Sequence, residues 1–269
     1  MTRLLVGCPV SHREWIIRRW ADHILIACER AGLEPSFITV AHPEDPTPAV
    51  LGAHLGERDL TVIPTLVASE ETARRFAYRL VAEWNPPRYE QMAAIRNVML
   101  DEVRRQAPQF FLSVDSDVLL HGDAVTTMMG LVADYGAVGS ACFLSRPPGR
   151  RADGEIGSPN WTAPNYAMLD RAERVMRKWQ PNLTRRVDVL MAVKLMTPAA
   201  YKVDYEGHYQ GEDIGWALAC RRAGVRFGWT STVVSKHVMV SRCAAHLEHD
   251  PSCFACVEPL DRTDPRCGY

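Results

Sequence analysis

The chain has 269 residues and a mass of 30.2 kDa, which is enough for one large α/β domain with a small appendix. Its 31 Lys and Arg residues nearly balance 32 Asp and Glu residues, for a formal net charge of -1, so no overall field attracts it to nucleic acid or to an anionic membrane. The N-terminal apolar run is too short for a signal peptide, and no stretch of about 18 apolar residues occurs. We therefore expect a soluble, cytoplasmic protein without a membrane partner.

Strands and helices alternate along the first half of the sequence. Short apolar runs predict strands, and apolar residues at helical spacing before Gly32 and Pro108 predict helices. The predicted order is a strand at 4–8, a helix at 14–31, strands at 36–40 and 60–67, a helix at 89–106, a strand at 110–114, a helix at 124–135 and a strand at 137–143. This order predicts a mainly parallel sheet with helices on both faces, in which ligands collect at the carboxyl ends of the strands.

The second half of the sequence is less regular. Residues 145–164 contain four prolines and three glycines without any period, which is typical of a functional loop or of a mobile insertion. A strand at 187–197, a helix from 211 to 224 and a strand at 225–229 follow. Residues 241–269 have almost no apolar period, so we divide the chain into a domain at 1–240 and an appendix at 241–269.

The most informative segment is Asp115-Ser116-Asp117, at the end of the predicted strand 110–114. Alternate side chains of an extended segment point the same way, so the two carboxylates can converge on one hard cation of the kind that carries a diphosphate. Asp-x-Asp is a common pattern, however, and the alternative is a polar junction between strand and loop.

Two further motifs follow in a particular order. Glu212 and Asp213 open a helix, and His237 comes after the next strand. Over about residues 3 to 240, this order resembles the GT-A glycosyltransferases, especially the family 2-like enzymes. The resemblance implies a Rossmann-like GT-A fold, an α/β fold with a mainly parallel sheet flanked by helices, and transfer of a sugar from a nucleotide-diphospho sugar to an acceptor hydroxyl.

The resemblance also implies roles for these residues. Asp115 and Asp117 would bind Mn2+ or Mg2+, with His237 completing the coordination, although His237 can also be an ordinary loop histidine. Asp213 would be the catalytic base of an inverting reaction and Glu212 its orienting neighbour. Both acids also suit the N-terminus of a helix without any catalytic role.

The nucleotide donor would lie against the loop after the first strand and the helix before Asp115. Pro9, Val10 and Arg13 occupy that loop, and Ser116 completes the donor-binding set. Arg96 and Asn97 match a donor-contacting pair of the family, but a solvated helix face is the alternative. A UDP-sugar is the commonest donor in the family. Trp216 could stack on an acceptor or belong to the core.

The acceptor is left open by the sequence as a glycan, a protein side chain or a modified nucleobase. A local basic surface leaves DNA open as a partner, although charge runs usually form a solvated face. The arginines of this surface are Arg146, Arg150, Arg151, Arg171, Arg174, Arg177, Arg185 and Arg186.

The appendix is rich in cysteine and histidine. Its candidate ligands are Cys243, His246, His249, Cys253, Cys256 and Cys267. Their spacing suits a structural, tetrahedral Zn2+, with disulfide or redox pairing, or no joint role, as alternatives. Four other cysteines lie in apolar contexts and are predicted to be core thiols: Cys8, Cys28, Cys142 and Cys220.

Two other functions compete with glycosyl transfer. One is a catalytically inactive nucleotide or nucleic-acid binding module with a zinc knuckle. The other is a nucleotidyltransferase, which also uses paired aspartates on a metal but usually has a Gly-rich loop after its first strand, and residues 7–10 do not form one.

Overall fold

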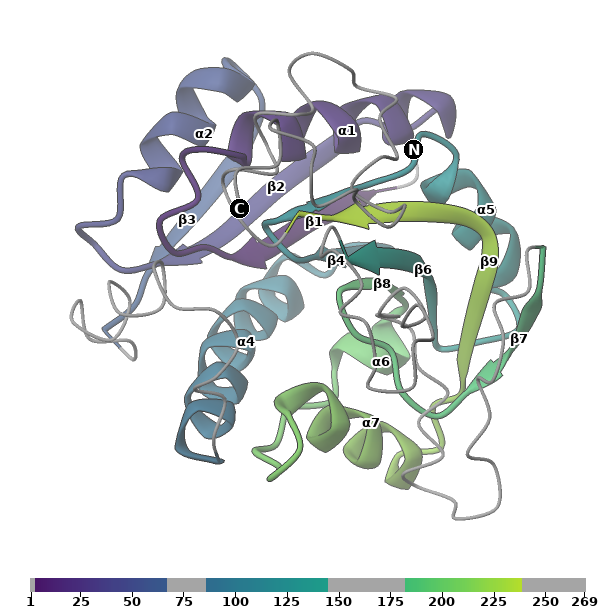
Figure 1. The fold of residues 1–269 in the computed structure, drawn as a ribbon. Coiled ribbons are helices and arrows are strands. Elements are labelled where there is room, and N and C mark those ends of the chain that lie inside the picture. Colours follow the sequence, from purple (N-terminus) through teal and green to yellow (C-terminus); the bar gives the residue numbers. More distant parts are fainter. Residues whose placement is uncertain (1–2, 67–85, 145–181, 239–269) are drawn as a thin grey trace, which may run out of the picture.

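A computed structural model describes residues 3–66, 86–144 and 182–238, and in these ranges one sheet is flanked by helices on both faces (Figure 1). The strands are β1 (Leu4–Pro9), β2 (Pro35–Ala41), β3 (Leu60–Pro64), β4 (Phe110–Val114), β5 (Val118–Leu119), β6 (Ala137–Leu144), β7 (Thr184–Val187), β8 (Val193–Met196) and β9 (Phe227–His237). The helices are α1 (Ile17–Arg30), α2 (Thr47–Leu55), α4 (Pro86–Gln106), α5 (Ala124–Leu131), α6 (Pro198–Tyr201) and α7 (Glu212–Arg222).

The sheet is mixed, not mainly parallel as the sequence predicted. Its order is β3-β2-β1-β4-β8-β6-β9-β5, with β7 also paired to β9. The four neighbouring strands β3, β2, β1 and β4 run parallel to one another, and β6 runs parallel to β9. Strand β8 is antiparallel to its neighbours β4 and β6, and β5 and β7 are antiparallel to β9. The segment 188–192, which joins β7 to β8, contains no helix.

Each face of the sheet has its own apolar core. Helices α1, α2 and α5 cover one face, where Trp20 and Ile24 are buried against β1 and β4, and α4, α6 and α7 cover the other (Figure 1). The second core contains Trp216, which is stacked between Tyr205 and Phe227 at ring distances of 5.4 and 4.9 Å. Trp216 is therefore a core residue and not an acceptor platform.

Several element boundaries differ from those predicted. Helix α2 lies between the predicted strands 36–40 and 60–67 and was not predicted; Pro48 is at its start, where a missing N–H costs nothing. The predicted strand 187–197 is divided between β7 and β8. Strand β9 continues to His237, past a register irregularity opposite Ser140 and Ala141. The predicted core thiols Cys8, Cys28, Cys142 and Cys220 are confirmed as buried.

Three predictions fall on residues outside the described ranges. These are the loop at 145–164, the Cys/His-rich appendix at 241–269 with its zinc site, and the arginines from Arg146 to Arg177. Among the helices that the structure describes, none is long and apolar enough to cross a membrane.

Candidate functional site

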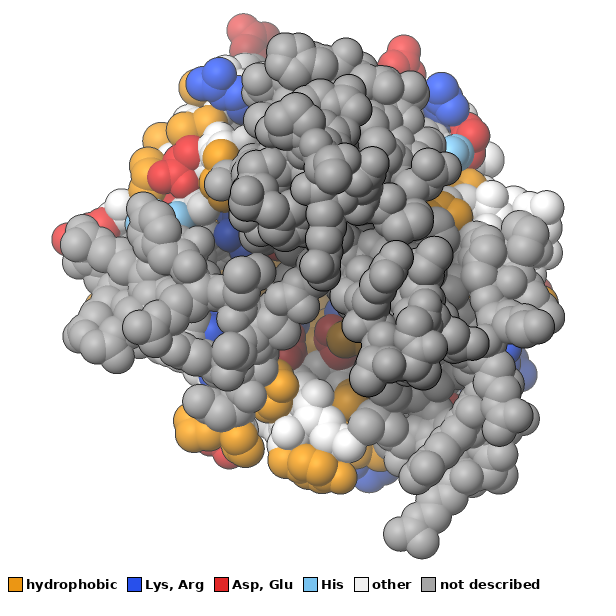
Figure 2. All heavy atoms as spheres, in the orientation of Figure 1, with side chains coloured by type: hydrophobic (Ala, Val, Ile, Leu, Met, Phe, Trp, Pro, Cys, Tyr) orange, Lys and Arg blue, Asp and Glu red, His pale blue; other side chains and the backbone are white. Residues whose placement is uncertain are grey.

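The candidate site lies where the carboxyl ends of several strands meet. Strands β1 and β4 are parallel neighbours, so the segments after Pro9 and Val114 emerge at the same edge. His237, the last residue of β9, is paired with Val118 of β5, which brings it next to the turn that follows β4. Figure 2 shows acidic side chains near the middle of the face that it draws.

Residues Asp115 to Val118 form a tight turn, in which the N–H of Val118 donates to the carbonyl of Asp115 at 2.9 Å. An extended segment, as predicted from the sequence, would have placed both carboxylates on one side. The turn instead directs them to different partners: Asp115 contacts Arg96, and Asp117 contacts Arg13 and His237. The motif therefore links two groups of charged side chains.

The first group is centred on Asp117. Its Oδ1 lies 2.9 Å from His237 Nε2, and its Oδ2 accepts a hydrogen bond of 3.3 Å from Arg13 Nη2. Burial alone would raise the pKa of Asp117, but His237 and Arg13 outweigh it and lower this pKa to about 2. Burial alone would lower the pKa of His237, and the Asp117 carboxylate reverses the effect and raises it. The two groups stabilise each other's charged forms.

The Asp117 and His237 pair fits a divalent cation. Two ligands about 2.1 Å from one ion and at right angles to each other lie roughly 3 Å apart, and the carboxylate oxygen and imidazole nitrogen are 2.9 Å apart. A carboxylate with an imidazole suits Mn2+ better than Mg2+.

Arg13 is held in place by a clamp between the loop after β1 and the start of α2. Asp45 accepts N–H groups of His12 and Thr47, both at 2.8 Å, and Thr47 Oγ1 accepts the N–H of Arg13 at 2.9 Å. His12 has a positive φ of 49°, which turns the chain sharply before Arg13.

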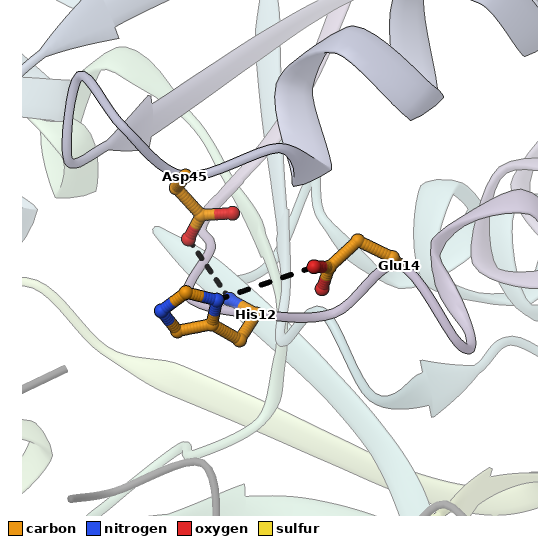
Figure 3. A group of neighbouring side chains, drawn as sticks. All are labelled: His12, Glu14 and Asp45. Atoms are coloured by element: carbon orange, nitrogen blue, oxygen red, sulfur yellow. Dashed lines mark hydrogen bonds and ion pairs between the residues drawn. The ribbon is translucent and has the colours of Figure 1, made fainter. Parts of the chain in front are cut away.

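Asp45 and Glu14 both point toward His12 in this clamp (Figure 3). Within the described ranges, His12, Glu14 and Asp45 form the one group of three such side chains whose ligand atoms lie within 4.8 Å of one another. Both carboxylate oxygens of Asp45 already accept backbone N–H groups, so we assign this group to holding the loop.

The second group is centred on Arg96 of α4. Its Nη2 donates to Asp115 at 3.1 Å and its Nε donates to Glu212 at 3.2 Å, while only 4% of its surface is exposed. The alternative of a solvated helix face is therefore wrong. The guanidinium connects the turn after β4 with the first residue of α7, and its Nη1 has no hydrogen-bond partner among the described residues.

Glu212 and Asp213 form the first turn of α7, and each has 6% of its surface exposed. Gly211 precedes them with a φ of 136°, a conformation that a residue with a side chain rarely adopts. Burial raises the pKa of Glu212 and the neighbouring Asp213 raises it further, against the opposing charge of Arg96. Asp213 Oδ1 accepts a hydrogen bond of 2.6 Å from Lys194 Nζ.

Lys194 was missed by the sequence reasoning. It lies in β8, and none of its surface is exposed. The signal was present, because a lysine within the apolar run from Val189 to Met196 is unusual for a buried strand. A buried cation there requires an anionic partner from another element, and the helix that opens with Glu212 supplies it.

The other residues predicted to bind the donor have varied positions. Pro9 ends β1, Val10 is buried with its N–H bonded to Val40, and Ser116 is buried in the turn. Asn97 exchanges hydrogen bonds of 2.9 and 2.7 Å with the backbone of Tyr205. Its amide therefore holds the segment before α7, and this structural role occupies the group that was predicted to contact the donor.

Only Arg185 and Arg186 of the predicted basic surface are described by the structure. Both lie in β7. Arg185 packs over the ring of Trp229 at 5.5 Å, so it is partly covered, whereas Arg186 is exposed.

Comparisons with known proteins support the fold. No family model matches the chain, and no curated protein matches it. Among solved structures, a fragment of TarS from S. aureus (residues 1-349) has a TM-score of 0.52 at 14% sequence identity, over 88% of this chain and 60% of that one. The same fragment in complex with UDP-GlcNAc has a TM-score of 0.53 at 14% identity, over 88% and 58% of the two chains, and its complex with UDP has 0.51 at 14%, over 88% and 60%. The chain therefore spans about 60% of the length of these structures.

At this level of identity the likeness concerns the fold. The mixed α/β sheet with helices on both faces is consistent with the GT-A fold that the sequence motifs predicted.

Proposed function

We propose that this protein is a metal-dependent glycosyltransferase that moves a sugar from a nucleotide-diphospho sugar, a UDP-sugar in the first instance, to an acceptor hydroxyl. The reaction inverts the anomeric carbon. The hydroxyl belongs to a glycan, a protein side chain or a modified nucleobase, and DNA is one polymer that can carry it.

One observation carries the proposal: Arg96 joins the turn after β4 to the start of α7. A site for the departing diphosphate, at Asp117, and a pair of buried carboxylates, at Glu212 and Asp213, thereby belong to one structure at the carboxyl edge of the sheet. Ligands collect at this edge in open α/β sheets. The fold is one that, in the TarS fragment, is seen with UDP-GlcNAc and with UDP.

The donor side of the site requires positive charge. A divalent cation held by Asp117 and His237 would supply Lewis acidity to the leaving diphosphate. Asp115, which the sequence also assigned to the metal, holds Arg96 in this geometry. Arg13 lies in the loop after β1 and donates a hydrogen bond to Asp117. Its guanidinium can also form a pair of hydrogen bonds to phosphate oxygens.

The acceptor side requires a base. We assign this role to Asp213, and Glu212 orients the acceptor beside it. In the transfer step the acceptor oxygen forms a bond to the anomeric carbon, and the bond from that carbon to the diphosphate oxygen breaks with its electron pair leaving on UDP. The hydroxyl proton passes to Asp213. A positioned general base of this kind accelerates proton transfer by about 100- to 10,000-fold.

Substitution of Asp117 tests the donor site. We expect Asp117→Asn to abolish Mn2+-dependent binding of UDP, measured by isothermal titration calorimetry, and release of UDP from UDP-GlcNAc, UDP-glucose or UDP-galactose. The matched control is Asp123→Asn, because Asp123 is an exposed aspartate paired with Arg30 away from the site. UDP binding by the wild-type protein that is unaffected by EDTA would refute the metal-dependent donor site.

The competing functions differ in the product that the protein releases. An inactive binding module binds UDP with Mn2+ but releases none from any of the three donors. A nucleotidyltransferase releases pyrophosphate from a nucleoside triphosphate, which a glycosyltransferase does not.

A further inference from the structure

Lys194 is a fully buried cation in the middle of the sheet. It belongs to β8, between β4 and β6, and 0% of its surface is exposed. Lysine is almost never fully buried without a partner, and the partner here is Asp213, whose Oδ1 lies 2.6 Å from Lys194 Nζ. The motifs recognised in the sequence do not include this cation.

Aromatic rings surround the ammonium group. Nζ lies 5.6 Å from the centre of the Tyr205 ring and 5.7 Å from that of Trp216, and these two rings are stacked on each other. The faces of such rings attract a cation and hold it without water. Asn97 fixes the backbone of Tyr205 in turn. The position of Nζ is therefore set by packing before any substrate arrives.

Asp213 needs such a partner in order to act as a base. Only 6% of its surface is exposed, and burial disfavours the charged form of a carboxylate. A neutral carboxylic acid cannot take the proton of an acceptor hydroxyl. A positive charge at 2.6 Å offsets the cost of burial, and one strong hydrogen bond on Oδ1 fixes the plane of the carboxylate.

We propose that Lys194 is a positioning residue for Asp213: its ammonium group pairs with the buried carboxylate and holds Oδ1, so that Oδ2 is the oxygen that receives the acceptor proton. This inference rests on the proposed function, because Asp213 acts as a base only in that reaction. Glu212 has a separate cation, Arg96, so each acid of the pair is oriented by its own partner.

A positioning role predicts a specific kinetic pattern. Lys194→Met removes the charge and keeps most of the side-chain volume. The donor is whichever of UDP-GlcNAc, UDP-glucose and UDP-galactose the wild-type protein turns over fastest. We expect kcat for release of UDP from this donor to fall at least about 100-fold. The donor KM and the Kd for UDP with Mn2+ should stay within about threefold of the wild-type values, since positioning a base affects the transition state and not donor binding. Lys202→Met is the matched control, because Lys202 is exposed.

The double variant separates positioning from a merely structural contribution. If Lys194 acts through Asp213, adding Lys194→Met to Asp213→Asn should change kcat by less than about threefold, because effects of residues that act as a unit are not additive. This comparison also holds if Lys194→Met alone fails to fold, since the double variant leaves no unpaired charge at this position.

The possible results lead to different conclusions. A Lys194→Met variant with kcat within threefold of wild type, or a double variant about 100-fold slower than Asp213→Asn, overturns the positioning role while the proposed function stands. A wild-type protein that neither binds UDP with Mn2+ nor releases UDP from any of the three donors overturns the proposed function, and the positioning role with it.

Discussion

At the scale of single residues, the site is built from oppositely charged side chains that are buried together. Asp115 and Glu212 both form ion pairs with Arg96. Asp213 is paired with Lys194, and Asp117 is paired with Arg13 and His237. A buried charge is tolerated only when it is paired and hydrogen-bonded. Each of these carboxylates is held in a fixed orientation by a cation from a different element.

Arg96 should be the most costly of these cations to remove. We expect Arg96→Met to lower the free energy of unfolding by about 3 to 5 kcal/mol, because it leaves Asp115 and Glu212 buried without their shared partner. Urea unfolding followed by circular dichroism measures this loss. Arg105→Met is the control on the same helix, since Arg105 is exposed and paired with Glu102 within α4, and it should leave the unfolding midpoint unchanged.

A loss below about 1 kcal/mol for Arg96→Met would contradict this account. It would show that leaving the two carboxylates without Arg96 costs no more free energy than breaking an exposed ion pair.

At the scale of elements, α7 presents its acidic first turn because it packs unusually close to the segment before it. Gly215 lies in that helix, and a Cβ atom built on it would be 1.9 Å from the carbonyl oxygen of Glu206. No side chain fits there without a shift of the backbone. The position of Glu212 and Asp213 therefore depends on the absence of a side chain at Gly215.

Gly215→Ala should accordingly lower both stability and turnover. We expect a loss of about 1 to 3 kcal/mol, typical of overpacking, together with a fall in kcat, because α7 must move away from Glu206 and takes Asp213 with it. Unfolding in urea and UDP release measure the two effects. Gly130→Ala is the matched control: Gly130 lies in α5 with nothing within 4 Å of a Cβ atom, and alanine favours a helix by up to about 1 kcal/mol over glycine.

Equal behaviour of the two alanine variants would show that α7 adapts to the extra methyl group. The close approach to Glu206 would then have no part in placing the acidic pair.

At the scale of the whole molecule, the contributions of metal binding and of protonation to stability should change with pH in opposite directions. The pKa of His237 is raised in the folded protein, because the attraction of Asp117 exceeds the opposing effect of burial. A raised histidine pKa stabilises the folded state fully below the unfolded value of about 6.5, and this stabilisation is lost as the pH rises through the folded pKa. A bound cation needs neutral imidazole, so its own contribution grows over the same pH range.

The melting temperature of the protein in EDTA should therefore fall more steeply above pH 6.5 for the wild type than for His237→Gln. Addition of Mn2+ should reverse this trend for the wild type only. Thermal unfolding between pH 6 and pH 9, with and without Mn2+, provides the measurement. Parallel curves for the two proteins in EDTA would mean that His237 does not carry an extra proton in the folded state.

The sequence by itself determined the class of fold and the main positions of the chemistry. Apolar runs and helical spacing located most strands and helices to within a few residues, because burial fixes which side chains are apolar. The carboxylates at 115, 117, 212 and 213 and the histidine at 237 could be recognised because they interrupt those patterns at the ends of elements. Their assignment to a metal and to a base remains a prediction.

Only the tertiary structure decided how these residues are paired. The turn at 115–118 separates two carboxylates that an extended segment would have placed together, and the antiparallel insertion of β8 brings Lys194 to Asp213. Arg96 meets Glu212, which is 116 residues away along the chain. Such contacts depend on strand direction and helix packing over long sequence separations, which local propensity does not encode.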